Sequence, residues 1–198
     1  YPIHQYQPIF STDDFSYLVG SMMRDGCLYV GKDTYQFSIT SEDWDFCEKC
    51  QSIVKNLFNK EGSIKTIYND IGKVSYYQLV VCSKDLVFFL KDLTLDKTTI
   101  PSFVFKNKKR MISFIQGIMD SDGWISKVNA SDGHIRYRVG FKNVSNWVED
   151  VRLIMCEKLK VSVGEMKETS NSRSEKKAFS FTINTYDYCK KIGFRIDR

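Results

Sequence analysis

The sequence has 198 residues, of which 42% are hydrophobic, so it can bury a sizeable core as one domain or as two small domains packed together. No stretch is long and apolar enough to span a membrane and no signal peptide is visible, which excludes a membrane partner and indicates an intracellular protein. An organelle matrix and the cytoplasm of a prokaryotic or phage-infected cell are equally compatible with it. The sequence begins with Tyr1 rather than Met, so we expect the natural N-terminus to lie upstream.

The formal net charge of +5 is unevenly distributed along the chain. Residues 1–100 contain 10 Lys and Arg against 13 Asp and Glu, whereas residues 101–198 contain 19 against 11. A basic excess of this size is a mild indication of a polyanionic partner. The placement of the charges must therefore decide what that partner is.

Six cysteines are present, and two of them form the CxxC sequence Cys47-Glu-Lys-Cys50. No second CxxC and no His at zinc spacing accompanies this pair, which lies in helical sequence. We therefore interpret all six as reduced thiols of an intracellular protein.

The first half of the chain alternates between helical and strand patterns. Residues 1–12 read as an extended arm, and Ser11 or Thr12 is a suitable cap for the first helix. Strand 34–40 alternates strictly between apolar and polar residues, which indicates a half-buried sheet. The predicted elements are a helix at 13–25, strands at 27–32 and 34–40, a helix at 41–58, strands at 63–69 and 74–82, and a helix at 83–92.

The second half repeats this order at a nearly constant offset. Tyr35 corresponds to Tyr137 and Asp85 to Asp187, which indicates an internal duplication. The predicted elements are a helix at 111–121, strands at 124–129 and 134–142, a helix at 145–159, strands at 163–170 and 176–184, and a helix at 185–192. We therefore predict an α+β fold of two pseudo-symmetric αββαββα repeats.

The domain organisation follows from the duplication. We expect an N-terminal arm at 1–12, a first repeat at 13–92, a linker at 93–110 and a second repeat at 111–198. The linker ends in the basic run Lys106–Arg110, which is either a solvated loop or a contact to a phosphate backbone.

The first helix of each repeat carries the same short pattern. Leu18–Gly26 reads Leu-Val-Gly-Ser-Met-Met-Arg-Asp-Gly, and Ile115–Gly123 reads Ile-Gln-Gly-Ile-Met-Asp-Ser-Asp-Gly. Each pattern closes with an Asp followed by Gly, and an Asp at a helix C-terminus is unfavourable because the helix dipole is negative there. We expect the closing Gly to take the left-handed conformation that ends a helix.

The matched acids, Asp25 and Asp122, favour a shared catalytic centre. If the two helices pack at Gly20 and Gly117, their backbones approach closely and the acids emerge side by side. Two adjacent carboxylates repel unless a cation lies between them, and a hard divalent ion such as Mg²⁺ prefers oxygen ligands. Paired metal–carboxylate centres can activate water and stabilise the leaving oxygen in phosphodiester hydrolysis, with one centre for each strand. The alternative, that each Asp only caps its turn, suits a lone Asp-Gly better than a matched pair.

The two nine-residue patterns resemble the LAGLIDADG motif of homing endonucleases. This resemblance covers about residues 13–198 and implies that Asp25 and Asp122 bind the metal ions, with help from the carbonyls of Arg24 and Ser121. It implies a monomer, intron-encoded or free-standing, that cuts both strands of a long asymmetric duplex across the minor groove and leaves 3′ overhangs. The implied cofactor is Mg²⁺, or another divalent cation such as Mn²⁺ or, in a crystal, Ca²⁺.

The family pattern also raises questions about individual residues. Arg24 stands where the family usually has a small residue, so the helix interface must accommodate or expel a long side chain. Lys84 follows the fourth strand, where family members often place a basic residue near the scissile phosphate, so we predict a catalytic role; the alternative is an exposed lysine at a helix start. Ser41 and Asn143 correspond to polar residues that organise water in the family.

The polar faces of the strands predict a DNA-binding saddle. Arg and Lys pair with guanine edges, Gln and Asn with adenine, and Ser or Thr with either, and strands can lie in the major groove. The alternative is a plain solvated sheet face. The predicted DNA-binding residues are Thr34, Gln36, Ser38, Thr40, Lys65, Tyr76 and Gln78 in the first repeat, and His134, Arg136, Arg138, Lys142, Lys167, Lys176, Ser180, Thr182 and Asn184 in the second.

The sequence therefore predicts a site-specific, divalent-metal-dependent endonuclease acting on double-stranded DNA. An alternative of the same fold is a maturase that binds its own intron RNA. A third reading, a transcription regulator that lost the chemistry, usually needs a separate helix-turn-helix, for which the chain has no room.

Overall fold

The computed structural model describes residues 10, 12–129, 133–170 and 177–196. The first repeat contains α1 (Asp13–Asp25), β1 (Gly26–Val30), β2 (Tyr35–Ser41), α2 (Trp44–Phe58), β3 (Ser63–Tyr68), β4 (Val74–Cys82) and α3 (Lys84–Thr94). The second contains α4 (Lys108–Asp122), β5 (Trp124–Asn129), β6 (Ile135–Asn143), α5 (Val148–Leu153), β7 (Lys167–Ser170), β8 (Lys177–Ile183) and α6 (Thr185–Lys191). A 3-10 helix at Ser102–Lys106 precedes α4. The predicted α+β fold of two αββαββα repeats is confirmed.

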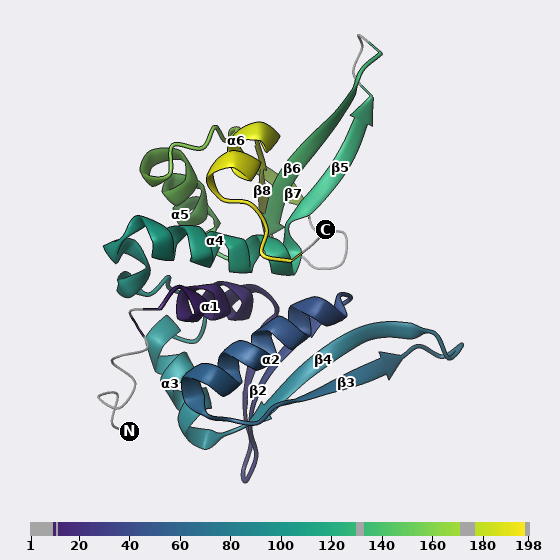
Figure 1. Ribbon diagram of the computed structural model, residues 1–198, viewed down its shortest axis with the longest axis vertical. Coiled ribbons are helices and arrows are strands. Elements are labelled where there is room, and N and C mark those ends of the chain that lie inside the picture. Colours follow the sequence, from purple (N-terminus) through teal and green to yellow (C-terminus); the bar gives the residue numbers. More distant parts are fainter. Residues whose placement is uncertain (1–9, 11, 130–132, 171–176, 197–198) are drawn as a thin grey trace.

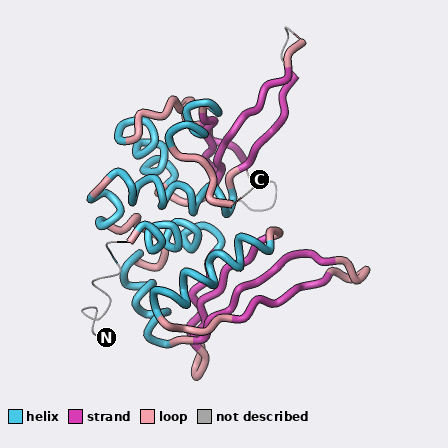
Figure 2. Tube along the Cα trace, viewed as in Figure 1, coloured by secondary structure: helices cyan, strands magenta, loops and turns pink. Residues whose placement is uncertain are grey.

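Each repeat builds one four-stranded antiparallel sheet. The strand orders are β1-β2-β4-β3 and β5-β6-β8-β7, so the two sheets have the same topology. Helices α1 and α4 lie against each other at the centre, and the two sheets diverge from them (Figure 1). The hairpins β3–β4 and β5–β6 reach outward from the helical centre, as the strand colouring of Figure 2 also shows.

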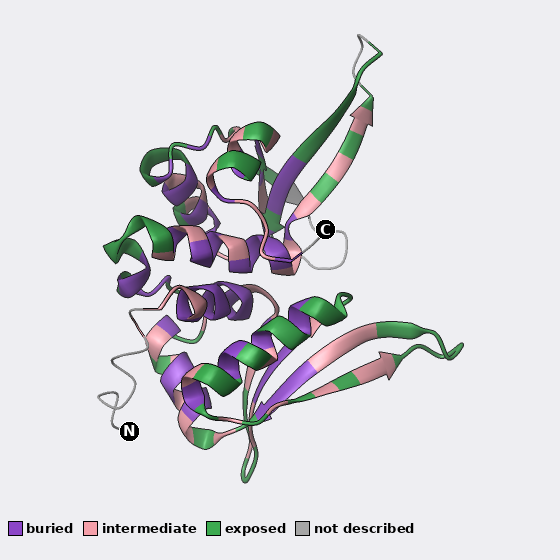
Figure 3. Ribbon diagram, viewed as in Figure 1, coloured by how far each residue is buried: buried purple, intermediate pink, exposed green. Residues whose placement is uncertain are grey.

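Apolar side chains from both repeats form a continuous core around the central helices. Every residue of α1 from Phe15 to Met23 is buried, because the helix packs against α4 on one side and against its own sheet and α2 on the other. The buried colouring in Figure 3 is concentrated on α1, α4 and the strand segments nearest to them. The outer parts of the hairpins are exposed and therefore available to a partner.

Several element boundaries differ from the sequence prediction, among them those of α4, β7 and α5. Helix α4 begins at Lys108 rather than 111, because the Asn107 side chain accepts a hydrogen bond from the Arg110 N–H and caps it. Strand β7 is confined to Lys167–Ser170, with Val163 forming an isolated bridge to Ile183. The helix predicted at 145–159 begins at Val148 and turns into a π-helix at Ile154–Lys158.

None of the described helices is long and apolar enough to cross a lipid bilayer.

Candidate metal and nucleic-acid site

Two glycines set the distance between the central helices. A Cβ atom at Gly20 would lie 2.2 Å from the Phe114 carbonyl oxygen, and one at Gly117 would lie 2.1 Å from the Tyr17 carbonyl oxygen. Both distances are far below van der Waals contact, so the backbones of α1 and α4 touch at these positions. The buried Ser21 hydroxyl lies in the same contact, 3.0 Å from the Tyr17 carbonyl and 3.4 Å from the Gly117 carbonyl.

A buried polar pair crosses the helix interface behind the site. The Tyr17 hydroxyl donates a 2.8 Å hydrogen bond to Oδ2 of Asp120, which is fully buried. The Arg195 backbone N–H donates to the same oxygen at 3.0 Å. Burial and the Asp120 charge raise the pKa of Tyr17 well above its ordinary value. Asp120 therefore belongs to the interface between the repeats.

The ends of α1 and α4 differ from the expected left-handed caps. Gly26 has φ −78° and ψ 147°, and Gly123 has φ −68° and ψ 144°, so both are extended. The prediction of a left-handed glycine is wrong, because each chain passes directly from helix into strand. Glycine is required there for space: a Cβ at Gly26 or Gly123 would lie 2.6 or 2.5 Å from the carbonyl oxygen of Met22 or Met119.

These helix ends bring the two acids to one cavity. Asp25 and Asp122 both line a cavity of about 1020 Å³, together with residues from β2, β4, β5 and β6. Their side chains are 22% and 34% exposed, so they are reachable from solvent. The cavity opens between the two sheets at the point where the strands leave the central helices.

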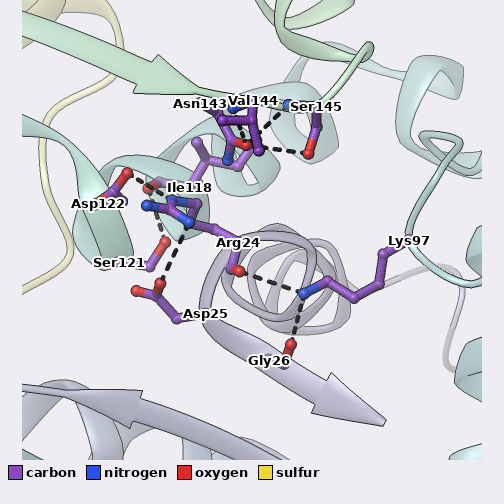
Figure 4. Close-up of polar contacts among 10 residues, drawn as sticks. All are labelled: Arg24, Asp25, Gly26, Lys97, Ile118, Ser121, Asp122, Asn143, Val144 and Ser145. Atoms are coloured by element: carbon purple, nitrogen blue, oxygen red, sulfur yellow. Dashed lines mark hydrogen bonds and ion pairs between the residues drawn. The ribbon is translucent and has the colours of Figure 1, made fainter. Parts of the chain in front are cut away.

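Arg24 is accommodated at this centre rather than expelled from it. Its Nε lies 2.5 Å from Oδ2 of Asp122, and its Nη1 lies 4.0 Å from Oδ1 of Asp25. Figure 4 shows the guanidinium group between the two carboxylates, although Arg24 itself belongs to α1. The first repeat thus supplies a cation to the acid of the second repeat.

Lys97 is a second cation at the end of α1, and the sequence analysis did not identify it. Its ammonium donates hydrogen bonds to the carbonyl oxygens of Gly26, at 2.5 Å, and Arg24, at 3.3 Å, from the side away from Asp122 (Figure 4). Burial lowers the pKa of Lys97, and the nearby Asp25 charge offsets this lowering only in part. Leu95, Asp96 and Lys97 all have positive φ, of 46°, 55° and 69°.

Three consecutive non-glycine residues at positive φ are unfavourable, at about 1 kcal/mol or more each. The Lys97 N–H is held by the buried Thr94 hydroxyl at 3.1 Å, which helps to fix this turn. The strain is concentrated where the chain presents an ammonium group to the helix end beside Asp25. The sequence carries no local signal for this turn, because irregular turns have no periodic pattern.

The donor set suits a hard divalent ion. Carboxylate and carbonyl oxygens are the ligands that Mg²⁺ and Mn²⁺ prefer. In the described part of the chain no group of three or more His, Cys, Asp or Glu could hold a metal, so carbonyls and water would have to complete the coordination of Asp25 and Asp122. Two backbone carbonyls were predicted as ligands. The Arg24 carbonyl accepts a hydrogen bond from Lys97. Ser121, which carries the other, lines the cavity next to Asp122.

Lys84 is not brought to the acids. Its ammonium lies 5.1 Å from the ring centroid of Tyr35, which pairs with Val30 at the end of β1 remote from Asp25. Val30 is four residue steps along the strand from Gly26, or about 13 Å. We expected Lys84 to reach the two acids, but the structure places its side chain away from them. Helix α3 begins beside Tyr35, at the end of β2 that is remote from Asp25.

Ser41 and Asn143 do line the cavity, but each stabilises its own turn. The Ser41 hydroxyl accepts a hydrogen bond from the Asp43 N–H at 3.1 Å. The Asn143 Oδ1 accepts one from the Ser145 N–H at 3.0 Å. The same turn thus occurs at the end of the second strand in both repeats.

In the first sheet, the predicted base-reading residues share one face. Directly paired residues lie on the same side of an antiparallel sheet, and the register pairs Thr40 with Gln78, which in turn pairs with Lys65. Tyr35, Phe37 and Ile39 point to the core instead. Gln36 and Tyr76 belong to the same polar face by alternation.

In the second sheet, the corresponding face is basic. The register pairs Arg138 with Ser126 and Lys142 with Ser180, which also pairs with Lys167. Thr182 pairs with Gly140 on this face, and Arg136 lies on it by alternation. Arg136, Arg138, Lys142 and Lys167 are exposed. Trp124 covers Gly140 at the inner end, beside the acids.

Some predicted residues are not placed to read a base. Ser38 is only 4% exposed, between Cys27 and Val80 of the neighbouring strands, so it is too buried to read a base. The Asn184 side chain caps α6 by accepting a hydrogen bond from the Asp187 N–H. Thr34 lies in the β1–β2 turn and His134 just before β6. Lys176 lies outside the described residues.

The basic run Lys106–Arg110 lies away from this site. It spans the end of the 3-10 helix and the first turn of α4, whereas Asp122 is the last residue of α4. A 15-residue helix separates its ends by about 22 Å. Lys108 and Lys109 are therefore at the opposite end of the helix from the acids.

Two αββαββα repeats that meet at a glycine contact between their first helices define the LAGLIDADG fold. Comparison with solved structures supports this. A variant of the homing endonuclease I-DmoI in complex with its target DNA and Mn has a TM-score of 0.63 at 18% identity, over 91% of this chain and 93% of that one. The N-terminal LAGLIDADG domain of DUF199/WhiA has a TM-score of 0.62 at 15% identity, over 98% and 87%.

Sequence comparison adds less. No family model matches the chain. An uncharacterized protein of Methanocaldococcus jannaschii is 24% identical over 160 residues, which is 81% of this chain. The chain spans 59% of the length of that relative. The similarities establish the fold, and the resemblance predicted from the two motifs is confirmed at that level.

Proposed function

We propose that this chain binds duplex DNA along its two sheets and cleaves it, with a divalent cation, at the Asp25–Asp122 centre. The observation that carries the proposal is the shared cavity. Acids from two helices 97 positions apart line one opening, and the polar faces of both sheets lead into it. If the sheet faces were only solvated, nothing would require both of them to meet the two acids at one cavity.

The sheets support a DNA partner by their chemistry. Arg and Lys on the second sheet can pair with guanine edges or phosphates, and Gln on the first can pair with adenine. Two sheets that diverge from a common centre suit a long asymmetric site better than a short symmetric one. I-DmoI, which has the same fold, has been solved with its target DNA, and with Mn or Ca.

Within the cavity each residue has a definite task. The Asp25 and Asp122 carboxylates, with the Ser121 carbonyl, would hold the cation, while Lys97 fixes the end of α1. The exposed Lys142 on the cavity wall would attract a phosphate. When bound, a divalent ion at such a centre lowers the pKa of coordinated water and stabilises the leaving oxygen. By the same proposal the chain acts as a monomer, encoded in an intron or free-standing, and leaves 3′ overhangs.

Selection of cleaved molecules from a randomised duplex library with Mg²⁺ tests this proposal and reveals the target. Asp25→Asn and Asp122→Asn should each abolish cleavage of at least one strand and leave DNA binding largely intact. Asp150→Asn, an exposed acid on α5, is the matched control and should cleave normally. Normal cleavage by both motif variants would show that the centre is misassigned.

A second candidate is a DNA-binding protein of this fold that does not cut. The Arg24–Asp122 ion pair favours it, because this contact neutralises an acid without a metal. Sequence-selective binding of duplex DNA with no cleavage in Mg²⁺ or Mn²⁺ would support this candidate. Selective binding of structured RNA in the same assay would instead favour the intron maturase.

A further inference from the structure

We propose that Arg24 is an internal cation that competes with the divalent ion for Asp122, and that duplex DNA relieves this competition by drawing the guanidinium onto a phosphate. This inference rests on the proposed metal centre and adds a residue that controls its occupancy. Arg24 is adjacent in sequence to Asp25, yet its shortest contact is with the acid of the other repeat.

The geometry makes the two cations compete for the same oxygen, Oδ2 of Asp122. The Arg24 Nε donates a 2.5 Å charge-assisted hydrogen bond to Oδ2 of Asp122. A divalent ion bound to that oxygen would lie about 2.0–2.6 Å from it, in the space that the guanidinium fills. Two positive charges at that separation repel strongly, so an ion can bind this oxygen only if the guanidinium leaves it.

The surroundings let the side chain move while the backbone stays in place. Lys97 holds the Arg24 and Gly26 carbonyls, and Gly26 donates its N–H to the Met22 carbonyl. The guanidinium, by contrast, faces a cavity of about 1020 Å³, and the Arg24 side chain is 31% exposed. Movement therefore requires only rotation about side-chain bonds.

A phosphate group is the natural second partner for this guanidinium. Arginine binds phosphate and carboxylate with the same planar arrangement of N–H donors, so a backbone phosphate in the cavity offers an equivalent contact. The ion binds only the fraction of molecules in which Asp122 is released, so the free protein has a weakened apparent affinity. By linkage, DNA and the ion then strengthen each other's binding.

Direct ion binding tests the competition without any cleavage measurement. Calorimetric titration of the DNA-free protein with Mn²⁺ should show about ten-fold tighter binding for Arg24→Met than for the natural chain. Arg24→Lys, which retains the charge, should show a smaller gain. Arg152→Met breaks the 2.6 Å ion pair with Glu149 on α5 and is the matched control, with unchanged affinity. Circular dichroism checks that each variant is folded.

A second titration tests the role of DNA. A 30-base-pair duplex of arbitrary sequence should tighten Mn²⁺ binding to the natural chain and have a much smaller effect on Arg24→Met. Equal Mn²⁺ affinity of the natural chain and Arg24→Met, without DNA, would overturn the proposal even if the protein cleaves its target. Tighter binding by Arg24→Met would uphold the competition even if no cleavage is ever found.

Discussion

The two repeats share a topology but supply different chemistry. The polar face of the first sheet is mostly uncharged, with Thr40 and Gln78, whereas that of the second carries Arg136, Arg138 and Lys142. At the helix ends the distribution of positive charge is the opposite. The cations nearest to the acids, Arg24 and Lys97, both come before the second repeat in the chain. Duplication thus conserves the frame, and the charges on it have diverged.

The duplicated frame is where the largest effect of a substitution is expected. Gly117→Ala places a Cβ 2.1 Å from the Tyr17 carbonyl, and backbone atoms cannot yield as a flexible side chain can. We expect a loss of about 3 kcal/mol or more in the free energy of unfolding, measured by urea denaturation. Gly20→Ala should behave alike if the two sides of the interface are equivalent.

The control for this prediction is another glycine. Gly72 lies in the β3–β4 turn at φ 75°, and a Cβ there meets no atom within 4 Å. Gly72→Ala should cost only about 1 kcal/mol, from backbone strain alone. Equal losses for Gly72→Ala and Gly117→Ala would contradict the close helix contact.

The buried polar pair at the interface predicts an intermediate effect. Tyr17→Phe keeps the ring but removes the donor to Asp120, at an expected cost of about 2 kcal/mol. Because burial raises the pKa of Tyr17, its folded form stays neutral while the unfolded form ionises near pH 10.0. This contribution to stability is present below pH 10 and falls as the pH rises above it.

Unfolding measured between pH 8 and pH 11.5 checks this dependence. The natural chain should lose more stability across that range than Tyr17→Phe does. The same loss in both proteins would show that Tyr17 is not the group responsible.

The smallest predicted effects concern DNA binding and follow from the charge difference between the two sheets. Arg138→Ala should lower the slope of log affinity against log salt by about 1, because one phosphate or base contact loses its cation. Gln78→Ala on the first sheet should leave that slope unchanged. Fluorescence anisotropy over a salt series measures both, and equal slopes would mean that the second sheet has no special electrostatic role.

The fold was readable from the sequence because its signals are periodic and occur twice. Strands β4 and β5 occupy the predicted residues, and the Asp-Gly pairs mark the helix ends. The glycine conformation was predicted wrongly, since a helix that passes directly into a strand needs no left-handed cap. The sequence showed that Gly26 was special without showing why.

The cations of the site were harder to predict, for a physical reason. Arg24 departs from the family pattern in the sequence, but the direction of a long flexible side chain depends on where Asp122 lies in three dimensions. Lys97 comes from a turn of left-handed residues without a sequence period, and Lys84, which has a clear position in the pattern, lies at the wrong end of β2. Pattern alone fixes backbone elements better than it fixes the ends of side chains.

The central claim is that acids from both repeats form one metal centre. Anomalous diffraction from crystals of the protein with duplex DNA and Mn²⁺ measures this directly. We predict anomalous density within about 2.5 Å of carboxylate oxygens of both Asp25 and Asp122. Mn²⁺ bound elsewhere, with Arg24 still paired to Asp122, would contradict it.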